Sequence, residues 1–155
     1  MIDKEYAFAR LILKLANTII KNRNRHLKEL DLTASQADSL HFFRSHDFAS
    51  ISQLKEHLGI AHQTARGIVC RLEKKGLIQM QKSEADARFQ TICLTKKGLS
   101  VEKIIQHNGT RTGNKLLKGI RPDEQERFFE LLQTALKNIE HESDFGGHHE
   151  TKEEF

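Results

Sequence analysis

A run of side chains able to bond nucleic acid lies between positions 62 and 74. Gln can form two hydrogen bonds with adenine and Arg two with guanine, whereas His and Thr can reach base edges or phosphates. Arg and Lys further along the run can neutralise phosphates. The candidates are His62, Gln63, Thr64, Arg66, Arg71 and Lys74, with Lys75 beside them. Taken alone, such a run is equally typical of an exposed helical turn.

A second candidate is formed by Asp86 and Arg88, which stand two positions apart. A carboxylate at that spacing can hold a guanidinium group in a fixed fork. Arg88 would then point to a phosphate or to a narrow minor groove. The plain alternative is an exposed ion pair worth about 0–1 kcal/mol. Ser52 and Gln53, near the start of a preceding helix, are further candidates for contact with the DNA backbone.

These residues must be positioned by short helices, and two of the helix starts can be read from the sequence. Thr33 with Gln36, and Ser50 with Gln53, have the spacing of capping boxes. Each pair predicts a helix that begins just after its first member, and the first of these helices runs to about Arg44.

A helix-turn-helix followed by a hairpin is predicted next. Gly59 stands where a left-handed C-cap residue belongs, and a third helix covers about 62–75. The apolar period then changes to that of strands, at 77–81 and 89–94, with a polar turn at 82–87 between them. A hairpin directly after a helix-turn-helix is a wing. In this context we interpret the polar run at 62–74 as a reading helix.

Outer helices are predicted on both sides of this unit, over 5–29, from near Leu99, and from Pro122. The hydrophobic share of 37% is low for a self-sufficient globule of 155 residues. We therefore expect these helices to bury their apolar stripes against a second subunit. The stripes contain Tyr6, Phe8, Leu11, Leu13, Leu15, Ile19 and Ile20, then Val101, Ile104 and Ile105, then Phe128, Phe129, Leu131, Leu132, Leu136 and Ile139.

Charge and composition limit the class of protein. The net charge is +4, but 51–97 carries nine Lys/Arg against four acids, whereas 140–155 carries six acids against one Lys. The basic excess in the middle predicts a polyanionic partner there. No stretch approaches the roughly 20 apolar residues of a membrane span, and the charged start predicts no secretory signal. We expect a cytoplasmic protein that is not an enzyme, since it has no Gly-rich phosphate loop, GxSxG or HExxH motif, and we expect no cofactor.

The order and spacing of five segments resemble the MarR family of regulators. They are Leu32-Thr33-Ala34-Ser35-Gln36, Gln53 to Ile60, Arg71 to Ile78, Asp86-Ala87-Arg88, and Leu94-Thr95-Lys96-Lys97-Gly98. The resemblance implies a mainly α fold with a small β-hairpin wing and N- and C-terminal dimerisation helices. It implies a homodimer that binds double-stranded DNA at a pseudo-palindromic operator, usually as a repressor released by a small phenolic ligand, an oxidant or a metal. The DNA-reading role carries over to His62, Gln63, Thr64 and Arg66, and the wing pair to Asp86 and Arg88.

The predicted organisation follows from this resemblance. It comprises an N-terminal dimerisation helix (1–30), a winged DNA-binding domain (31–98), C-terminal dimerisation helices (99–141) and a disordered tail (142–155).

Three residues depart from the family pattern. Ala61 replaces an N-capping Ser or Asp, at a cost of about 1 kcal/mol, and Gly67 stands inside the reading helix, at roughly 0.5–1 kcal/mol relative to Ala. Ala87 replaces a basic residue often found between the wing Asp and Arg. Ala61 and Gly67 also favour an alternative interpretation, a winged helix module for protein–protein contact or assembly that binds DNA weakly.

The sequence leaves open which of three kinds of effector controls the protein, namely an oxidant, a metal or a phenolic ligand. Cys70 and Cys93 are expected to be small, partly buried residues and not redox sensors. No metal site is predicted, because Arg111 stands where a further ligand would be needed beside Asp38 and His107, which fall near ligand positions of zinc-sensing relatives. A phenolic or lipophilic effector would bind between the winged unit and the dimer helices, and its candidate wall residues are Leu15, Phe42, Phe43 and Ile105. An apolar stripe is more often core than pocket, and the sequence does not choose between the two.

Overall fold

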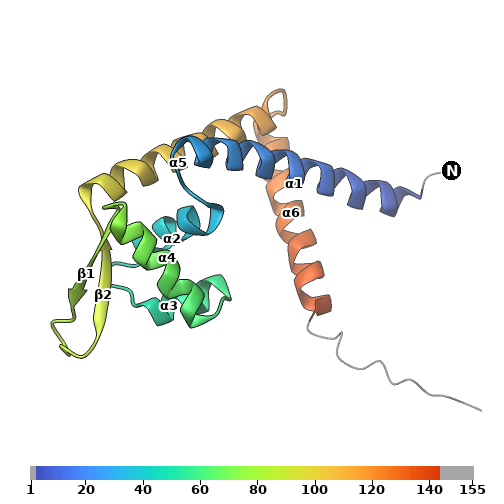
Figure 1. Cartoon of the computed structure of the whole chain (residues 1–155). Helices are drawn as coiled ribbons and strands as arrows, with labels where there is room; N and C mark the ends of the chain where they lie inside the picture. Colours follow the sequence, from blue (N-terminus) through green and yellow to red (C-terminus); the bar gives the residue numbers. More distant parts are fainter. Residues whose placement is uncertain (1–2, 144–155) are drawn as a thin grey trace, which may run out of the picture. The chain divides into compact units, whose positions relative to one another are not determined.

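The computed structural model describes residues 3–143, which form helices and one two-stranded antiparallel sheet (Figure 1). The fold is mainly α with a hairpin wing, as predicted. The chain divides into two compact units between Thr112 and Gly113. The elements are α1 (Lys4–Glu29), α2 (Ala34–Ser45), α3 (Ile51–Leu58), α4 (His62–Lys74), β1 (Ile78–Lys82), β2 (Gln90–Leu94), α5 (Lys96–Leu117) and α6 (Pro122–Ser143).

Both predicted capping boxes are present. The Gln36 N–H donates to Thr33 Oγ1 over 3.2 Å, and the Thr33 N–H donates back to Gln36 Oε1 over 3.2 Å. At α3 the same exchange joins Ser50 and Gln53 over 3.2 and 2.8 Å. Gly59 ends α3 with a φ of +63°, the left-handed geometry expected of it. The ends of α2 and α3 are therefore fixed by short-range signals.

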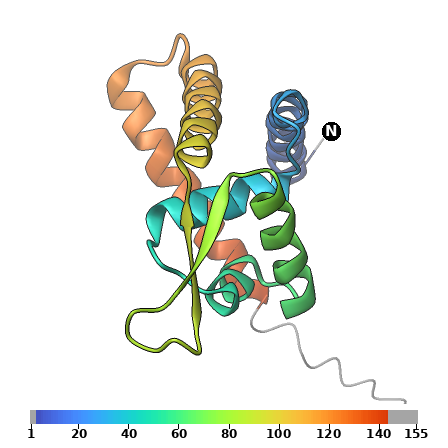
Figure 2. The same cartoon turned by 60° about the vertical axis from the view of Figure 1, so that its left-hand side comes forward.

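The hairpin pairs Ile78 with Leu94 at its base and Lys82 with Gln90 at its open end. Each strand begins one residue later than predicted, so Phe89 belongs to the connecting loop and not to β2. The Ile92 N–H also donates to Ala49 O over 2.9 Å, which attaches the segment between α2 and α3 to the hairpin. Viewed from the side, the loop of the hairpin projects away from the helices (Figure 2).

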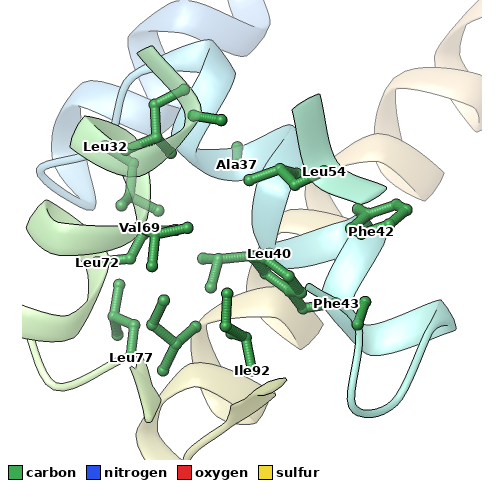
Figure 3. Close-up of a cluster of buried hydrophobic side chains, with 14 of the residues drawn as sticks. Leu32, Ala37, Leu40, Phe42, Phe43, Leu54, Val69, Leu72, Leu77 and Ile92 are labelled. Atoms are coloured by element: carbon green, nitrogen blue, oxygen red, sulfur yellow. The ribbon is translucent and has the colours of Figure 1, made fainter. Parts of the chain in front are cut away.

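One hydrophobic core holds α2, α3, α4 and the hairpin together. Figure 3 shows Leu40 and Phe43 of α2 meeting Leu72 of α4, Leu54 of α3 and Ile92 of β2, all fully buried. Burial of side chains of this size contributes about 1.5–3 kcal/mol each. The hairpin is thus anchored by its apolar face, while its opposite face stays free.

Helix α5 begins at Lys96, three residues earlier than predicted, because Thr95 caps it. Thr95 Oγ1 accepts from the Gly98 N–H over 3.0 Å and donates to Gly76 O over 2.6 Å. A Cβ on Gly98 would lie 1.9 Å from Leu77 O, so only glycine permits this approach of α5 to β1. The start of α5 is therefore locked to the base of the wing.

A buried charged side chain joins α5 to α2. Glu102 is only 2% exposed, and its carboxylate accepts from the Arg44 guanidinium and lies 3.2 Å from His41 Nδ1. Arg23 of α1 is likewise paired with Asp38 of α2. These ion pairs tie the helices on either side to the winged unit.

The long outer helices leave much apolar surface uncovered. In α1 only Leu27 is buried, and in the second unit most of the apolar side chains of α6 are exposed, with Phe128 half-buried. No helix among residues 3–143 is both long enough and apolar enough to span a membrane. Helix α6 continues two residues past the predicted end at 141, and the rest of the predicted tail, 144–155, lies outside the described residues. The exposed side chains are Tyr6, Phe8, Leu11, Ile12, Leu13 and Ile20 of α1 and Phe129, Leu131, Leu132, Leu136 and Ile139 of α6.

Candidate nucleic-acid interface

Helix α4 turns its polar side outward. Its buried stripe contains Ala65, Ile68, Val69 and Leu72. All six of the predicted DNA-binding residues in it are exposed, namely His62, Gln63, Thr64, Arg66, Arg71 and Lys74. Ala61 gives the helix no side-chain cap, as the sequence indicated. The backbone N–H groups of the first turn therefore keep their capacity to donate to an anion.

Two small residues, Gly67 and Cys70, occupy the centre of the outward face of α4. Helical geometry places Gln63, Gly67, Cys70 and Lys74 in one row opposite the buried stripe. A Cβ on Gly67 would lie 3.6 Å from Arg71 Nη1, so the guanidinium group extends across this small residue. The expectation that Cys70 is partly buried is wrong, because its place in this row exposes it, whereas Cys93 is half-buried as expected.

The predicted fork in the wing is present. Arg88 Nε and Nη2 donate to the two Asp86 carboxylate oxygens over 3.0–3.3 Å, and the Arg88 N–H donates to Asp86 Oδ1 over 3.0 Å. Both kinds of bond hold the pKa of Asp86 below its usual value. The bond from the Arg88 side chain has the larger effect, and the bond from the Arg88 backbone the smaller. Arg88 itself is 87% exposed. The fork orients a cation that remains open to a ligand.

A groove of about 410 Å³ brings together residues from three elements. Ser52 of α3, His62 of α4 and Arg88 of the wing loop all line it. Sequence reasoning named these three residues but did not place Ser50, Lys82 or Phe89 beside them. Lys82 could have been found from the sequence, because it is an exposed cation at the last position of β1. Hydroxyl, imidazole and cationic groups in one groove suit a phosphate backbone.

Not every predicted residue reaches this groove. Gln63, Thr64, Arg66, Arg71 and Lys74 lie on the outward side of α4 and do not line it. Gln53 has its side-chain oxygen engaged in the α3 capping box, which leaves only its amide N–H₂ group for a ligand.

Lys75, named beside them as a phosphate contact, is committed elsewhere. Its Nζ lies 3.1 Å from Asp31 Oδ2 and donates to the Asp31 carbonyl oxygen. Its role is therefore to hold the end of α4 against the loop before α2.

A separate cavity of about 210 Å³ lies between α1 and α5. Its apolar walls include Ile105, as predicted, but Phe42 and Phe43 belong to the core instead, because they face Leu54 and the hairpin (Figure 3). Leu15 does not line it either. The lining residues are Ile19, Arg23, His26, Leu27, Ile105, Asn108, Gly109 and Thr112.

No three His, Cys, Asp or Glu side chains gather as metal ligands anywhere in residues 3–143. Asp38 is paired with Arg23, and His107 is exposed on α5.

The chain is similar to known proteins in both sequence and structure. The sequence model of the MarR family matches residues 30–88. The chain is 28% identical over 133 residues to the "Uncharacterized HTH-type transcriptional regulator YybA" of Bacillus subtilis, covering 84% of this chain and 87% of the relative. It is 28% identical over 142 residues to the "Transcriptional repressor MprA" of Escherichia coli, covering 88% and 81%. The reduced form of MarR from E. coli superposes with a TM-score of 0.70 at 25% identity, covering 88% of this chain and 98% of that one.

Proposed function

We propose that this chain, which belongs to the MarR family, represses transcription by binding a pseudo-palindromic operator as a homodimer and is released by a small molecule. The observation that carries the proposal is the groove in which Ser52, His62 and the Asp86-held Arg88 converge beside the outward face of α4. The relatives are named as transcriptional regulators, and MprA as a repressor.

The arrangement suits both parts of DNA recognition. The outward side chains of α4 have the donors and acceptors needed for base edges in the major groove. The groove beside the wing supplies phosphate contacts, which fix the register of the helix on the duplex. We assign base reading to Gln63, Thr64 and Arg66, and phosphate contact to Arg71 and Lys74.

Dimer formation is supported by the uncovered apolar faces of α1 and α6, each considered by itself. Exposed large apolar side chains at helical spacing are typical of surfaces covered by a partner. A symmetric pair would present two winged units to two half-sites, about 34–36 Å or a multiple of that apart, which explains the expectation of a pseudo-palindromic operator.

The cavity between α1 and α5 is our candidate effector site. A cavity of about 150 Å³ is large enough for benzene, so 210 Å³ accommodates a substituted single ring. Ile19, Leu27 and Ile105 suit an apolar body. Arg23 has one Nη engaged with Asp38, and its remaining N–H donors suit a carboxylate or phenolate. Because α5 is locked to the wing through Thr95 and Gly98, a shift of α5 would move the wing.

The test is a mobility-shift assay on an operator selected from random-sequence DNA by the full chain, repeated with benzoate and salicylate titrated in. Binding should fall by orders of magnitude between about 50 and 200 mM salt, since several phosphates are neutralised. Arg66→Ala should weaken operator binding about 5- to 150-fold and leave random DNA nearly unaffected. Arg88→Ala should weaken both and reduce the salt dependence.

Lys103→Ala is the matched control, because it removes one exposed cation of α5 that lines neither the groove nor α4. It should bind like the unaltered protein. Equal losses on operator and random DNA for Arg66→Ala would refute base reading by that residue. Binding that does not change with salt concentration would refute the DNA-binding function. It would favour the alternative, a winged helix module for protein–protein contact or assembly.

A further inference from the structure

The wing presents an exposed aromatic ring next to its DNA-facing arginine. Phe89 is 63% exposed and directly follows Arg88. Its N–H donates to Asp86 O over 3.0 Å, and its carbonyl oxygen accepts from the Ser83 N–H over 2.8 Å. Because both backbone groups are engaged, the turn sets the direction in which the side chain leaves the main chain. Phe89 is thus an apolar group on the loop that projects from the winged unit (Figure 2).

The surroundings of Phe89 are polar and cationic. It lines the same groove as Ser52, His62 and Arg88, with Lys82 alongside. A single exposed phenylalanine needs no explanation by itself. Here, however, the ring lines the same groove as the groups assigned to the DNA backbone, so a DNA strand lying in that groove would contact both Arg88 and the ring.

A second exposed ring distinguishes this placement from chance exposure. Phe48 is 60% exposed, but it lines a different hollow, which shares Lys82 with the groove and contains neither His62 nor Arg88. The winged unit therefore offers two rings of equal exposure, of which only Phe89 lies in the candidate interface. This gives a matched control within one domain.

We propose that Phe89 packs against the deoxyribose edges of the minor groove where Arg88 enters, and so adds an apolar, salt-independent part to the affinity of the wing. This inference rests on the proposed DNA-binding function. Apolar side chains are regular partners of the minor groove in proteins that widen or bend it. A ring that requires the groove to open also favours operator sequences that deform easily, at positions that form no hydrogen bond with the protein.

The expected effect follows from the exposed area. A groove that covers about two thirds of the exposed part of one phenylalanine per subunit should strengthen binding of the symmetric pair by roughly 10- to 100-fold. Since no charge is involved, the slope of log affinity against log salt should be unchanged in Phe89→Ala, whereas each lost phosphate contact reduces the slope by about 0.9.

The experiment measures affinity of the full chain for the selected operator across salt concentrations, for Phe89→Ala, Phe89→Leu, Phe48→Ala and Arg88→Ala. Phe89→Ala should lose roughly 10- to 100-fold with an unaltered slope, and Phe89→Leu should recover most of the loss. Phe48→Ala should bind like the unaltered protein. A loss below about twofold in Phe89→Ala, with Arg88→Ala still impaired, would overturn the inference and leave the proposed function intact. Failure of Arg88→Ala and Arg66→Ala to change binding would overturn the proposed function itself.

A second measurement does not depend on a loss of binding. The chain has no tryptophan, so Phe89→Trp and Phe48→Trp each introduce a single fluorescent reporter. Operator DNA should protect the indole at position 89 from acrylamide quenching and leave the one at position 48 accessible. Equal accessibility at position 89 with and without DNA would refute the contact.

Discussion

Removing the Arg44 side chain should destabilise the protein because it strips the buried Glu102 carboxylate of its principal partner. Glu102 is 2% exposed and is held by Arg44 and, at 3.2 Å, by His41. The substitution Arg44→Met keeps the aliphatic length of the side chain and deletes the charge. The carboxylate would then be left in a dry site, facing only an imidazole that is itself exposed.

The magnitude follows from the burial of each partner. Breaking a fully buried ion pair by deleting one member costs about 3–5 kcal/mol. Arg44 is 34% exposed and His41 remains, so we expect the lower end, about 3 kcal/mol. Glu102→Gln should cost only about 1 kcal/mol, since the amide oxygen still accepts from Arg44. In the double variant the buried amide carries no charge, and we expect a coupling of about 2 kcal/mol between the two sites.

Urea unfolding at one fixed protomer concentration measures these values, because the stability of a dimer depends on concentration. With an m-value of about 2 kcal/mol/M, Arg44→Met should lower the midpoint by about 1.5 M. Arg127→Met is the control, since Arg127 and its partner Glu130 are both exposed, and it should cost at most about 1 kcal/mol. If the effects of Arg44→Met and Glu102→Gln simply add, the two side chains do not act as a buried pair and this reasoning is wrong.

Two further predictions concern the wing and the glycines. Gly98→Ala should destabilise the protein by about 1–3 kcal/mol or more, because its Cβ would meet Leu77 O at 1.9 Å. Gly67→Ala should instead stabilise it by about 0.5–1 kcal/mol. Thermal unfolding checks both, and an undiminished stability of Gly98→Ala would refute the close approach. The pKa of Asp86 should rise toward its ordinary value of 3.8 in Arg88→Ala, because the Arg88 side chain is the larger cause of its lowering. A folded-state pKa below the unfolded one stabilises the fork above about pH 4, and this contribution is lost as the pH falls through the lowered pKa. Carboxyl carbon shifts followed by NMR should show that rise, and identical titrations in both proteins would contradict it.

Short-range signals explain why so much of the winged unit could be predicted from the sequence. Capping boxes, the left-handed Gly59 and the change of period after α4 each depend on residues within about four positions of one another. The fork of Asp86 and Arg88 is of the same kind, since its members are two residues apart. The exposure of Cys70 could also have been predicted, because it falls opposite the buried stripe of α4.

Long-range pairings account for what sequence reasoning missed. Glu102 lies between Val101 and the apolar pair that follows it, and nothing nearby in the chain indicates a partner 58 residues earlier in α2. The groove depends likewise on bringing the start of α3 and α4 to the wing loop, so Lys82 and Phe89 acquire their meaning only in three dimensions. On the sequence, Phe42 and Phe43 could belong to the core or to a pocket wall, because apolar periodicity does not distinguish the two, and the structure places them in the core.

The uncovered apolar face of α1 has a consequence for the stability of the protein. The apolar residues of α1 have core-like spacing, yet Leu27 alone is buried in that helix. Most of the stability of a helix in a protein comes from packing of its amphipathic face, so α1 needs an apolar surface that the described residues of its own unit, 3–112, do not supply. The winged unit, by contrast, has its own core around Leu40 and Phe43. We infer that formation of the dimer and ordering of the outer helices are one equilibrium, to which the winged unit is coupled through Glu102 and Arg23.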